Sequence, residues 1–231
     1  MLRLSQTLAE GEKVQTHREQ SEQRRGVLVV LSGPSGVGKT SLCQQIVATI
    51  AAIRQSVSYT TRPPRPHEQD GREYFFISRP VFDQQAAAGD FLEWAEVHGH
   101  WYGTSRQQIA TLTAAGTDVL LAIDVQGAAQ LRTAGVDAVY IFVTPPSWEA
   151  LTARLTQRAS EAPEVQAQRL VVARHELAHY TEYDYVVTND QLPQAIATLQ
   201  AIVIAERHRV RRSGALAVAD LLTRFPTTTT Q

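Results

Sequence analysis

Residues 27–41 read VLVVLSGPSGVGKTS. The first five are apolar, which is typical of a strand buried on both faces, and a helix is expected over 39–52. Between them, residues 33–40 fit the pattern G-x-x-x-x-G-K-[ST], in which backbone N–H groups surround a phosphate. A glycine-rich turn with a chance Lys-Thr pair would explain the same letters. The flanking strand and helix favour a loop that binds a nucleoside triphosphate.

This phosphate loop, residues 33–40, assigns a role to its members. Lys39 would reach the β- and γ-phosphates of ATP, and the Thr40 hydroxyl would coordinate Mg²⁺. The predicted ATP-binding residues of the loop are Gly33, Pro34, Ser35, Gly36, Val37, Gly38, Lys39 and Thr40. Many reactions use such a loop, so the acceptor of the phosphate has to be inferred from other parts of the chain.

The composition limits the classes of protein to consider. A chain of 231 residues with 43% hydrophobic side chains suffices for one domain with small insertions. The formal net charge of −1 gives no general attraction to nucleic acid, and the one cysteine, Cys43, allows no internal disulfide. No apolar run approaches the ~20 residues that span a bilayer, and no secretory signal is apparent. We therefore expect a cytoplasmic protein that acts on small molecules, without nucleic-acid or membrane partners.

The order of elements predicts an α/β fold with a parallel sheet flanked by helices. Candidate strands are residues 27–31, 74–78, 91–97, 119–124, 139–143 and 185–188. Candidate helices are residues 39–52, 127–133, 146–158, 163–180 and 193–211. The segment 58–105, rich in proline and aromatic side chains, breaks this alternation and is predicted to be an inserted subdomain. The remaining predicted boundaries are a flexible extension over 1–25, a domain over 26–211 with its core in 26–57 and 106–211, and a tail over 212–231.

The insert contains a candidate second anion site. Residues 62–66 read RPPRP, and three residues make one turn of polyproline II, so Arg62 and Arg65 should project from the same side. A stiff backbone that holds two guanidinium groups together favours an anion between them, and phosphate matches their forked donors. Tyr74 could add a hydroxyl donor. A solvated, proline-rich surface loop is the alternative interpretation.

The strand at 91–97 places one carboxylate among apolar groups. Phe91, Glu93, Ala95 and Val97 share a face of this strand, and a carboxylate there needs a partner. Guanine offers N1–H and a 2-amino group in the spacing that a carboxylate accepts, whereas adenine would leave the charge unpaired. A Glu paired with a nearby Arg is the alternative.

Residues 98–105, HGHWYGTS, are predicted to form a tight turn. Tyr102 and Thr104 would present hydroxyls near the same region, and Ser105 would cap the helix that follows. His98 and His100 lack a clear third ligand, so we interpret them as turn residues and not as metal ligands.

Seven collinear motifs resemble the guanylate kinase family over roughly residues 26–211. They are SGPSGVGKT, SVSYTTRPPRPHE, DGREYFF, FLEWAEV, WYGTS, IDVQGA and TEYDYVVTND. The resemblance implies a P-loop kinase core, an inserted GMP-binding subdomain over 58–105 and a helical lid over about 151–169. It also implies transfer of the terminal phosphate of Mg-ATP to GMP, and to dGMP as well.

The resemblance implies individual roles for matching residues. The GMP phosphate would be held by Arg62, Arg65, Tyr74 and Tyr102, and guanine would be read by Ser58, Glu93 and Thr104. Asn189 would lie near the adenine of ATP. Arg154, Arg158 and Arg169 would cover the transferring phosphate from the lid, although charge on a helix surface is an alternative for them.

One position departs from the family. The strand 119–124 ends in Ala-Ile-Asp, where family members usually have an acid at both ends of this triplet. Asp124 alone remains to contact guanine or to support Mg²⁺ through water, and it could instead cap the helix after it. Ala122 also leaves open a related kinase of a sugar bisphosphate, while a binding module without catalysis is disfavoured by the intact phosphate loop. The sequence does not decide between a monomer and a homodimer.

Overall fold

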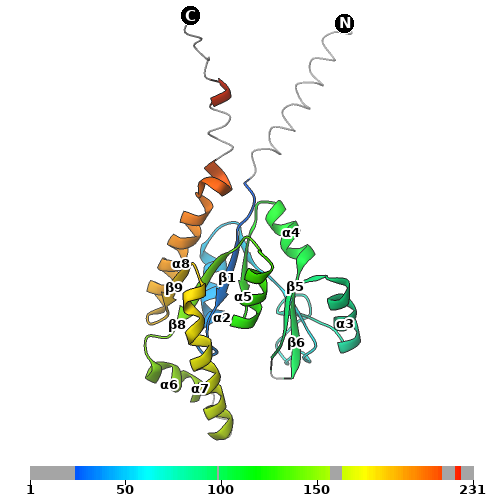
Figure 1. Cartoon of the computed structure of the whole chain (residues 1–231), viewed down its shortest axis with the longest axis vertical. Coiled ribbons are helices and arrows are strands. Elements are labelled where there is room, and N and C mark those ends of the chain that lie inside the picture. Colours follow the sequence, from blue (N-terminus) through cyan, green and yellow to red (C-terminus); the bar gives the residue numbers. More distant parts are fainter. Residues whose placement is uncertain (1–23, 98, 157–162, 215–221, 225–231) are drawn as a thin grey trace, which may run out of the picture.

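The computed structural model describes residues 24–97, 99–156, 163–214 and 222–224. Most of the predicted extension and tail lies outside the described residues, and so do His98 and Arg158. The described chain contains a larger sheet in the core and a smaller sheet beside it (Figure 1).

Five parallel strands form the core sheet, in the order β2-β7-β1-β8-β9. They are β1 (Leu28–Ser32), β2 (Ile53–Gln55), β7 (Asp118–Ala122), β8 (Val139–Thr144) and β9 (Tyr185–Thr188). Every residue of β1 is buried, because β7 and β8 flank the strand and helices cover both faces. The predicted parallel α/β sheet is confirmed.

Four helices sandwich this sheet. They are α2 (Lys39–Thr49), α4 (Arg106–Ala114), α5 (Val125–Thr133) and α8 (Leu192–Arg207). Val29 and Leu31 of β1 belong to the hydrophobic core that contains α2 and α8, while Val30 belongs to the core with α4 and α5. Because alternate side chains anchor β1 in both cores, the phosphate loop leaves the strand at a fixed position and enters α2.

The insert forms a separate four-stranded sheet in the order β4-β3-β6-β5. Its strands are β3 (Ser58–Thr60), β4 (Tyr74–Phe76), β5 (Phe91–Val97) and β6 (His100–Ser105). Phe91, Glu93 and Ala95 are buried and Trp94 and Glu96 are exposed, as the alternation in β5 predicts. The buried face of β5 therefore carries the carboxylate of Glu93 into the molecule.

The predicted tight turn over 98–105 is wrong for residues 100–105. Residues 100–105 are strand β6, which pairs antiparallel with β5 from Phe91↔Ser105 to Val97↔His100. The pairing supplies backbone partners that the local sequence does not reveal. Ser105 ends β6 and caps α4, since its hydroxyl accepts a hydrogen bond from the Gln108 N–H at 3.2 Å.

A helix that we did not predict, α3 (Arg79–Ala88), covers the small sheet. Its signals are Pro80 in the first turn and Gly89 in a left-handed conformation at the C-terminal end. Its buried Phe82 packs on Phe91, with ring centroids 4.7 Å apart. This contact fixes α3 against β5.

The remaining helices lie beyond β8. They are α6 (Trp148–Thr156), α7 (Pro163–Leu177), the 3₁₀ helix η1 (Ala178–Glu182) and the π-helix η2 (Val210–Gly214). The predicted helix over 163–180 is therefore wrong at its end, where α7 gives way to η1. No helix of the described chain is long and apolar enough to cross a membrane.

Candidate active site

The phosphate loop wraps the end of β1 with three glycines at positive φ. Gly33, Gly36 and Gly38 have φ values of 142°, 85° and 91°, which L side chains rarely adopt. A Cβ atom on Gly38 would also lie 2.5 Å from Nδ2 of Asn189. The loop conformation therefore requires glycine at position 38 for both its dihedral angle and its space.

Lys39 begins α2 and turns back onto this loop. Its Nζ donates hydrogen bonds to the carbonyl oxygens of Gly33 at 2.6 Å and Pro34 at 3.1 Å. Burial lowers the pKa of Lys39, against the opposing effects of Glu176 and Asp124. The ammonium is thus held at the mouth of the loop, where it can meet a phosphate.

Asn189 follows β9 and supports the loop from beneath. Its side-chain Nδ2 donates to the Val37 carbonyl at 2.7 Å, and its backbone carbonyl accepts from the Arg154 guanidinium at 3.0 Å. The Asn189 side chain is buried. The side-chain amide of Asn189 therefore fixes the phosphate loop at Val37, and Arg154 of α6 contacts the same asparagine.

Helix α7 contacts the same loop at Ser35. The Arg169 guanidinium donates to the Ser35 hydroxyl at 3.2 Å, and a Glu176 carboxylate oxygen accepts from the Ser35 N–H at 3.4 Å. Burial raises the pKa of Glu176, whereas Lys39 lowers it. We did not predict Glu176 at the site. Its spacing of seven residues from Arg169, which puts both on one helix face, is a signal that could have found it.

Replacing Glu176 by Gln should tighten ATP binding about fivefold, because the carboxylate repels a triphosphate that approaches Lys39. Equilibrium dialysis with radiolabelled ATP would measure the dissociation constant. The matched control is Glu149→Gln on the exposed surface of α6. An unchanged or weaker affinity for ATP in Glu176→Gln would contradict this repulsion.

Two arginines of the insert, Arg62 and Arg65, contact the carboxylate of Glu68, which lies in the same proline-rich segment. The Arg62 guanidinium donates to both oxygens of Glu68 at 2.8 and 2.9 Å, and the backbone N–H of Arg65 donates to Oε2 of Glu68 at 2.7 Å. The hydrogen bond from Arg62 is the main cause that lowers the pKa of Glu68 to about 2. The Arg65 side chain is exposed. An anion therefore lies between the two arginine positions, but it is the Glu68 carboxylate of the chain itself and not a phosphate.

Two tyrosines complete this anion-binding region. The Arg62 guanidinium carbon lies 5.6 Å from the centroid of the Tyr74 ring, and the ring of Tyr102 lies 5.7 Å from that of Tyr74. Burial raises the pKa of Tyr74, which keeps its hydroxyl a donor at neutral pH. Ser58 pairs with Tyr74 in the parallel register of β3 and β4 and is half-buried.

Glu68→Gln should raise the KM for GMP about tenfold, because Arg62 loses the charged partner that orients its guanidinium. Steady-state kinetics with GMP as the varied substrate would measure the change. Glu73→Gln removes a carboxylate that pairs with Arg72 at the surface and serves as the matched control. If both variants have the KM of the unaltered protein, Glu68 has no role in orienting Arg62.

Glu93 and Thr104 form a buried pair across β5 and β6. The Thr104 hydroxyl donates to Oε1 of Glu93 at 2.5 Å, and both residues are buried. Burial raises the pKa of Glu93 to about 7, although the hydrogen bond from Thr104 opposes this shift. The second oxygen, Oε2, lies 2.6 Å from where a Cβ on Gly127 would be. Glycine at position 127, which we did not single out, lets α5 approach this carboxylate.

Asp124 follows β7 and interacts with charged groups of both the phosphate loop and the small sheet. Its carboxylate caps α5 by accepting from the Gly127 N–H at 2.8 Å, so its alternative role as a helix cap is confirmed. The same charge acts on Lys39, Glu93 and Glu176, whose pKa values it raises. Ala122 packs against the core and supplies no second acid. The charge of Asp124 therefore acts both on Lys39 of the phosphate loop and on the buried Glu93–Thr104 pair of the small sheet.

Comparisons with known proteins agree with this geometry. The family model described as guanylate kinase matches residues 25–206. A guanylate kinase of Symbiobacterium thermophilum is 49% identical over 198 residues, which cover 86% of this chain and 94% of that protein. One of Dechloromonas aromatica is 51% identical over 180 residues, which cover 78% and 89%.

A solved structure extends the similarity to the fold. The crystal structure of guanylate kinase from Anaplasma phagocytophilum superposes with a TM-score of 0.68 at 32% identity, over 82% of this chain and 90% of that chain. The chain belongs to the guanylate kinase family.

Proposed function

We propose that the protein transfers the terminal phosphate of ATP to GMP, giving ADP and GDP. The buried Glu93–Thr104 pair is the observation that carries the choice of guanine, since an ionised carboxylate there accepts the N1–H and the 2-amino group of the base. ATP would lie in the phosphate loop, near Asn189. We place this activity in the cytoplasm, where both nucleotides are found.

The acceptor phosphate would be bound by the insert. Arg62 supplies donors beyond those used by Glu68, and Arg65, Tyr74 and Tyr102 lie in or beside the same region. Since the phosphate of GMP is already anionic, the transfer needs no strong general base. The catalytic contribution of the protein is to align the two phosphates and to neutralise the charge that spreads during transfer.

The segment over about 151–169 would act as a lid. Arg154 contacts Asn189, which holds the phosphate loop, and Arg169 contacts Ser35 of the loop itself. From these positions they would add positive charge over the transferring phosphate and help to exclude water. Arg158 would join them by analogy with the family.

The residues present fit a magnesium ion delivered with ATP. The Thr40 hydroxyl is exposed in the first turn of α2, and the Asp124 carboxylate supplies a further hard oxygen. The described residues contain no cluster of three or more His, Cys, Asp or Glu side chains that could hold a metal. This suits Mg²⁺, which takes most of its ligands from phosphates and water. The ion would neutralise charge on the phosphates of ATP.

A coupled assay of ADP release tests the proposal with five acceptors: GMP, dGMP, AMP, CMP and ribose 5-phosphate. We expect kcat/KM for GMP to exceed that for AMP by about 10⁴-fold, because AMP leaves Glu93 unpaired. Equal use of AMP and GMP would remove the proposed role of Glu93. Release with the sugar phosphate alone would favour a sugar kinase, and no release with any acceptor would favour a binding module.

A further inference from the structure

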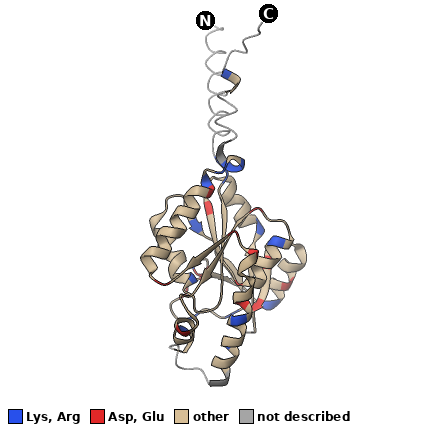
Figure 2. Cartoon of the chain, turned by 60° about the vertical axis from the view of Figure 1, so that its left-hand side comes forward, with Lys and Arg blue, Asp and Glu red and all other residues tan. Residues whose placement is uncertain are grey.

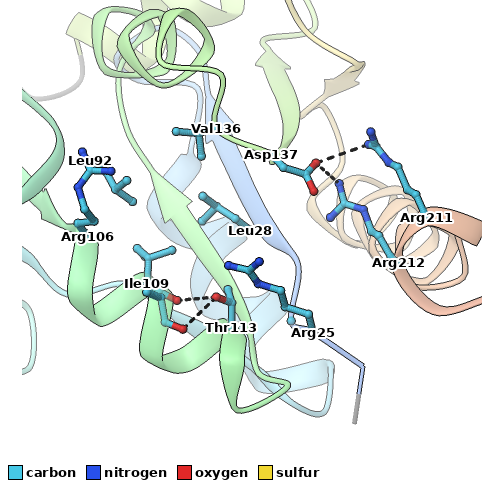
Figure 3. Close-up of a pocket in the computed structure, with 12 residues that line it drawn as sticks. Arg25, Leu28, Leu92, Arg106, Ile109, Thr113, Val136, Asp137, Arg211 and Arg212 are labelled. Carbon is cyan, nitrogen blue, oxygen red and sulfur yellow. Dashed lines mark hydrogen bonds and ion pairs between the residues drawn. The ribbon is translucent and has the colours of Figure 1, made fainter. Parts of the chain in front are cut away.

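A cavity of about 530 Å³ lies at the opposite end of β1 from the phosphate loop (Figure 3). Its floor is apolar and comes from four different elements or connections: Leu28, Leu92, Ile109 and Val136. This volume is within the range of pockets that bind small organic molecules. The cavity shares no lining residue with the site described above, so it would hold a ligand of its own.

Four arginines line this cavity with a single acid. They are Arg25, Arg106, Arg211 and Arg212, and the acid is Asp137. Figure 3 shows Arg106 on one side of the cavity and the two arginines of η2 on the other. Figure 2 shows the same concentration of basic residues around the end of α8 and η2. This positive charge is local, since the whole chain has a formal net charge of −1.

The acid neutralises only part of this charge. Arg212 and Arg211 both approach Asp137, at 3.2 and 3.8 Å, and Arg212 also lies 3.7 Å from the buried carboxylate of Glu206, which does not line the cavity. Within the described residues, Arg106 donates to the carbonyl oxygens of Gly89 and Phe91, each at 3.3 Å. No described residue pairs with the guanidinium of Arg25.

The neighbouring arginines show what a satisfied arrangement looks like at this end of the sheet. Arg24 and Arg207 share the buried carboxylate of Asp118, each at 2.6 Å. Of the cavity arginines, Arg211 and Arg212 share the exposed carboxylate of Asp137, whereas Arg25 and Arg106 have no carboxylate partner among the described residues. Guanidinium groups in excess over carboxylates favour a dianionic ligand, and phosphate matches their forked donors.

We infer that this cavity binds a phosphate ester of a planar, apolar group. The phosphate would meet the arginines, and the planar group would cover the apolar floor, where arginine can also stack on it. Because Leu92 and Arg106 adjoin the small sheet while Leu28 and Val136 belong to the core, the ligand would bridge the two parts of the fold.

Methyl NMR on the full-length protein tests this site with 1-naphthyl phosphate as the probe. With Ile, Leu and Val methyl groups labelled, Ile109, Leu92 and Val136 report on the cavity, and Val37 reports separately on the phosphate loop. We expect saturable shifts at the three cavity residues. Inorganic phosphate, which lacks the planar group, should bind there at least tenfold more weakly.

Charge-removing variants assign the shifts to the arginines. Arg25→Gln and Arg211→Gln should each weaken binding of 1-naphthyl phosphate at the cavity about tenfold, because each removes a charged donor at the rim. Arg54→Gln, at an exposed position on β2, should leave it unchanged. Both test residues are near the surface, so the fold should tolerate their loss, and the unperturbed methyl spectrum would verify it.

Three results would overturn the inference. One is the absence of shifts at Ile109, Leu92 and Val136, including the case in which only Val37 responds. Another is equal binding of inorganic phosphate and 1-naphthyl phosphate, since the floor would then contribute nothing. The third is a loss of affinity in Arg54→Gln as large as that in the two cavity variants, which would indicate a nonspecific charge effect.

Discussion

Lys39→Met should lower the kcat for GMP phosphorylation about 10³-fold. The ammonium of Lys39 lies at the mouth of the phosphate loop, held by the carbonyls of Gly33 and Pro34. Losing one preorganised donor to a developing charge typically costs 10²–10³-fold in rate, and a charged donor is at the upper end. Coupled ADP-release kinetics at saturating ATP and GMP would measure the change.

The fold should survive this substitution. Burial already lowers the pKa of Lys39, so an apolar side chain of similar length removes a charge that is costly to bury. Thermal unfolding would check that the variant is folded, and Arg54→Met provides an exposed basic position as a control. A kcat within threefold of the unaltered protein, in a folded variant, would contradict the role of Lys39.

Glu93→Gln should lower kcat/KM for GMP about 10²-fold and leave the affinity for ATP unchanged. A glutamine oxygen still accepts one hydrogen bond, but the amide nitrogen faces the second donor of guanine and the charge is lost. Glu96→Gln makes the same change on the exposed face of β5 and should have no effect. Equal turnover of GMP by both variants would refute the reading of guanine by Glu93.

The pH dependence of the same variant gives an independent measurement. Because the pKa of Glu93 is about 7, kcat/KM for GMP should rise as pH increases through 7, as the carboxylate ionises. Glu93→Gln should remove this rise. A profile that keeps the rise in the variant would assign it to another group.

Stability should change in the opposite direction to activity. The pKa of Glu93 is raised from 4.5 to about 7, so between these values the folded state binds more protons than the unfolded state. Stability therefore falls as pH rises through this window, and the full cost of about 3 kcal/mol is reached above pH 7. Glu93→Gln should consequently unfold at a higher urea concentration than the unaltered protein at pH 8, but not at pH 4.

Strong local patterns made much of the fold predictable. The apolar run of β1 and the loop after it predict a buried parallel strand and a phosphate site, and alternation in β5 correctly buries Glu93. The short strands β2 and β3 have three residues each, too few for a period to be visible. The sequence of β6 predicts a turn and not a strand, because β6 is stabilised by pairing with β5 and its own sequence has no strand pattern.

The candidate site was harder to predict from the sequence than the fold. The roles of the residues that the sequence did not reveal depend on contacts made only in the folded structure. Glu176 meets Ser35 across 141 positions, and no local pattern indicates that contact. Glu68 stands only six residues after Arg62, yet its role depends on how the proline-rich loop folds back. The need for glycine at position 127 depends on the position of the Glu93 carboxylate on another sheet.

The placement of Lys39 also has a chemical consequence for labelling. The chain contains only two lysines in its full sequence, Lys13 and Lys39. Lys39 is therefore the lone ε-amine within the described residues, and its lowered pKa leaves a larger neutral, nucleophilic fraction than an ordinary lysine has. An acylating reagent small enough to enter the phosphate loop would address the nucleotide site selectively within the folded domain, and bound ATP would protect it.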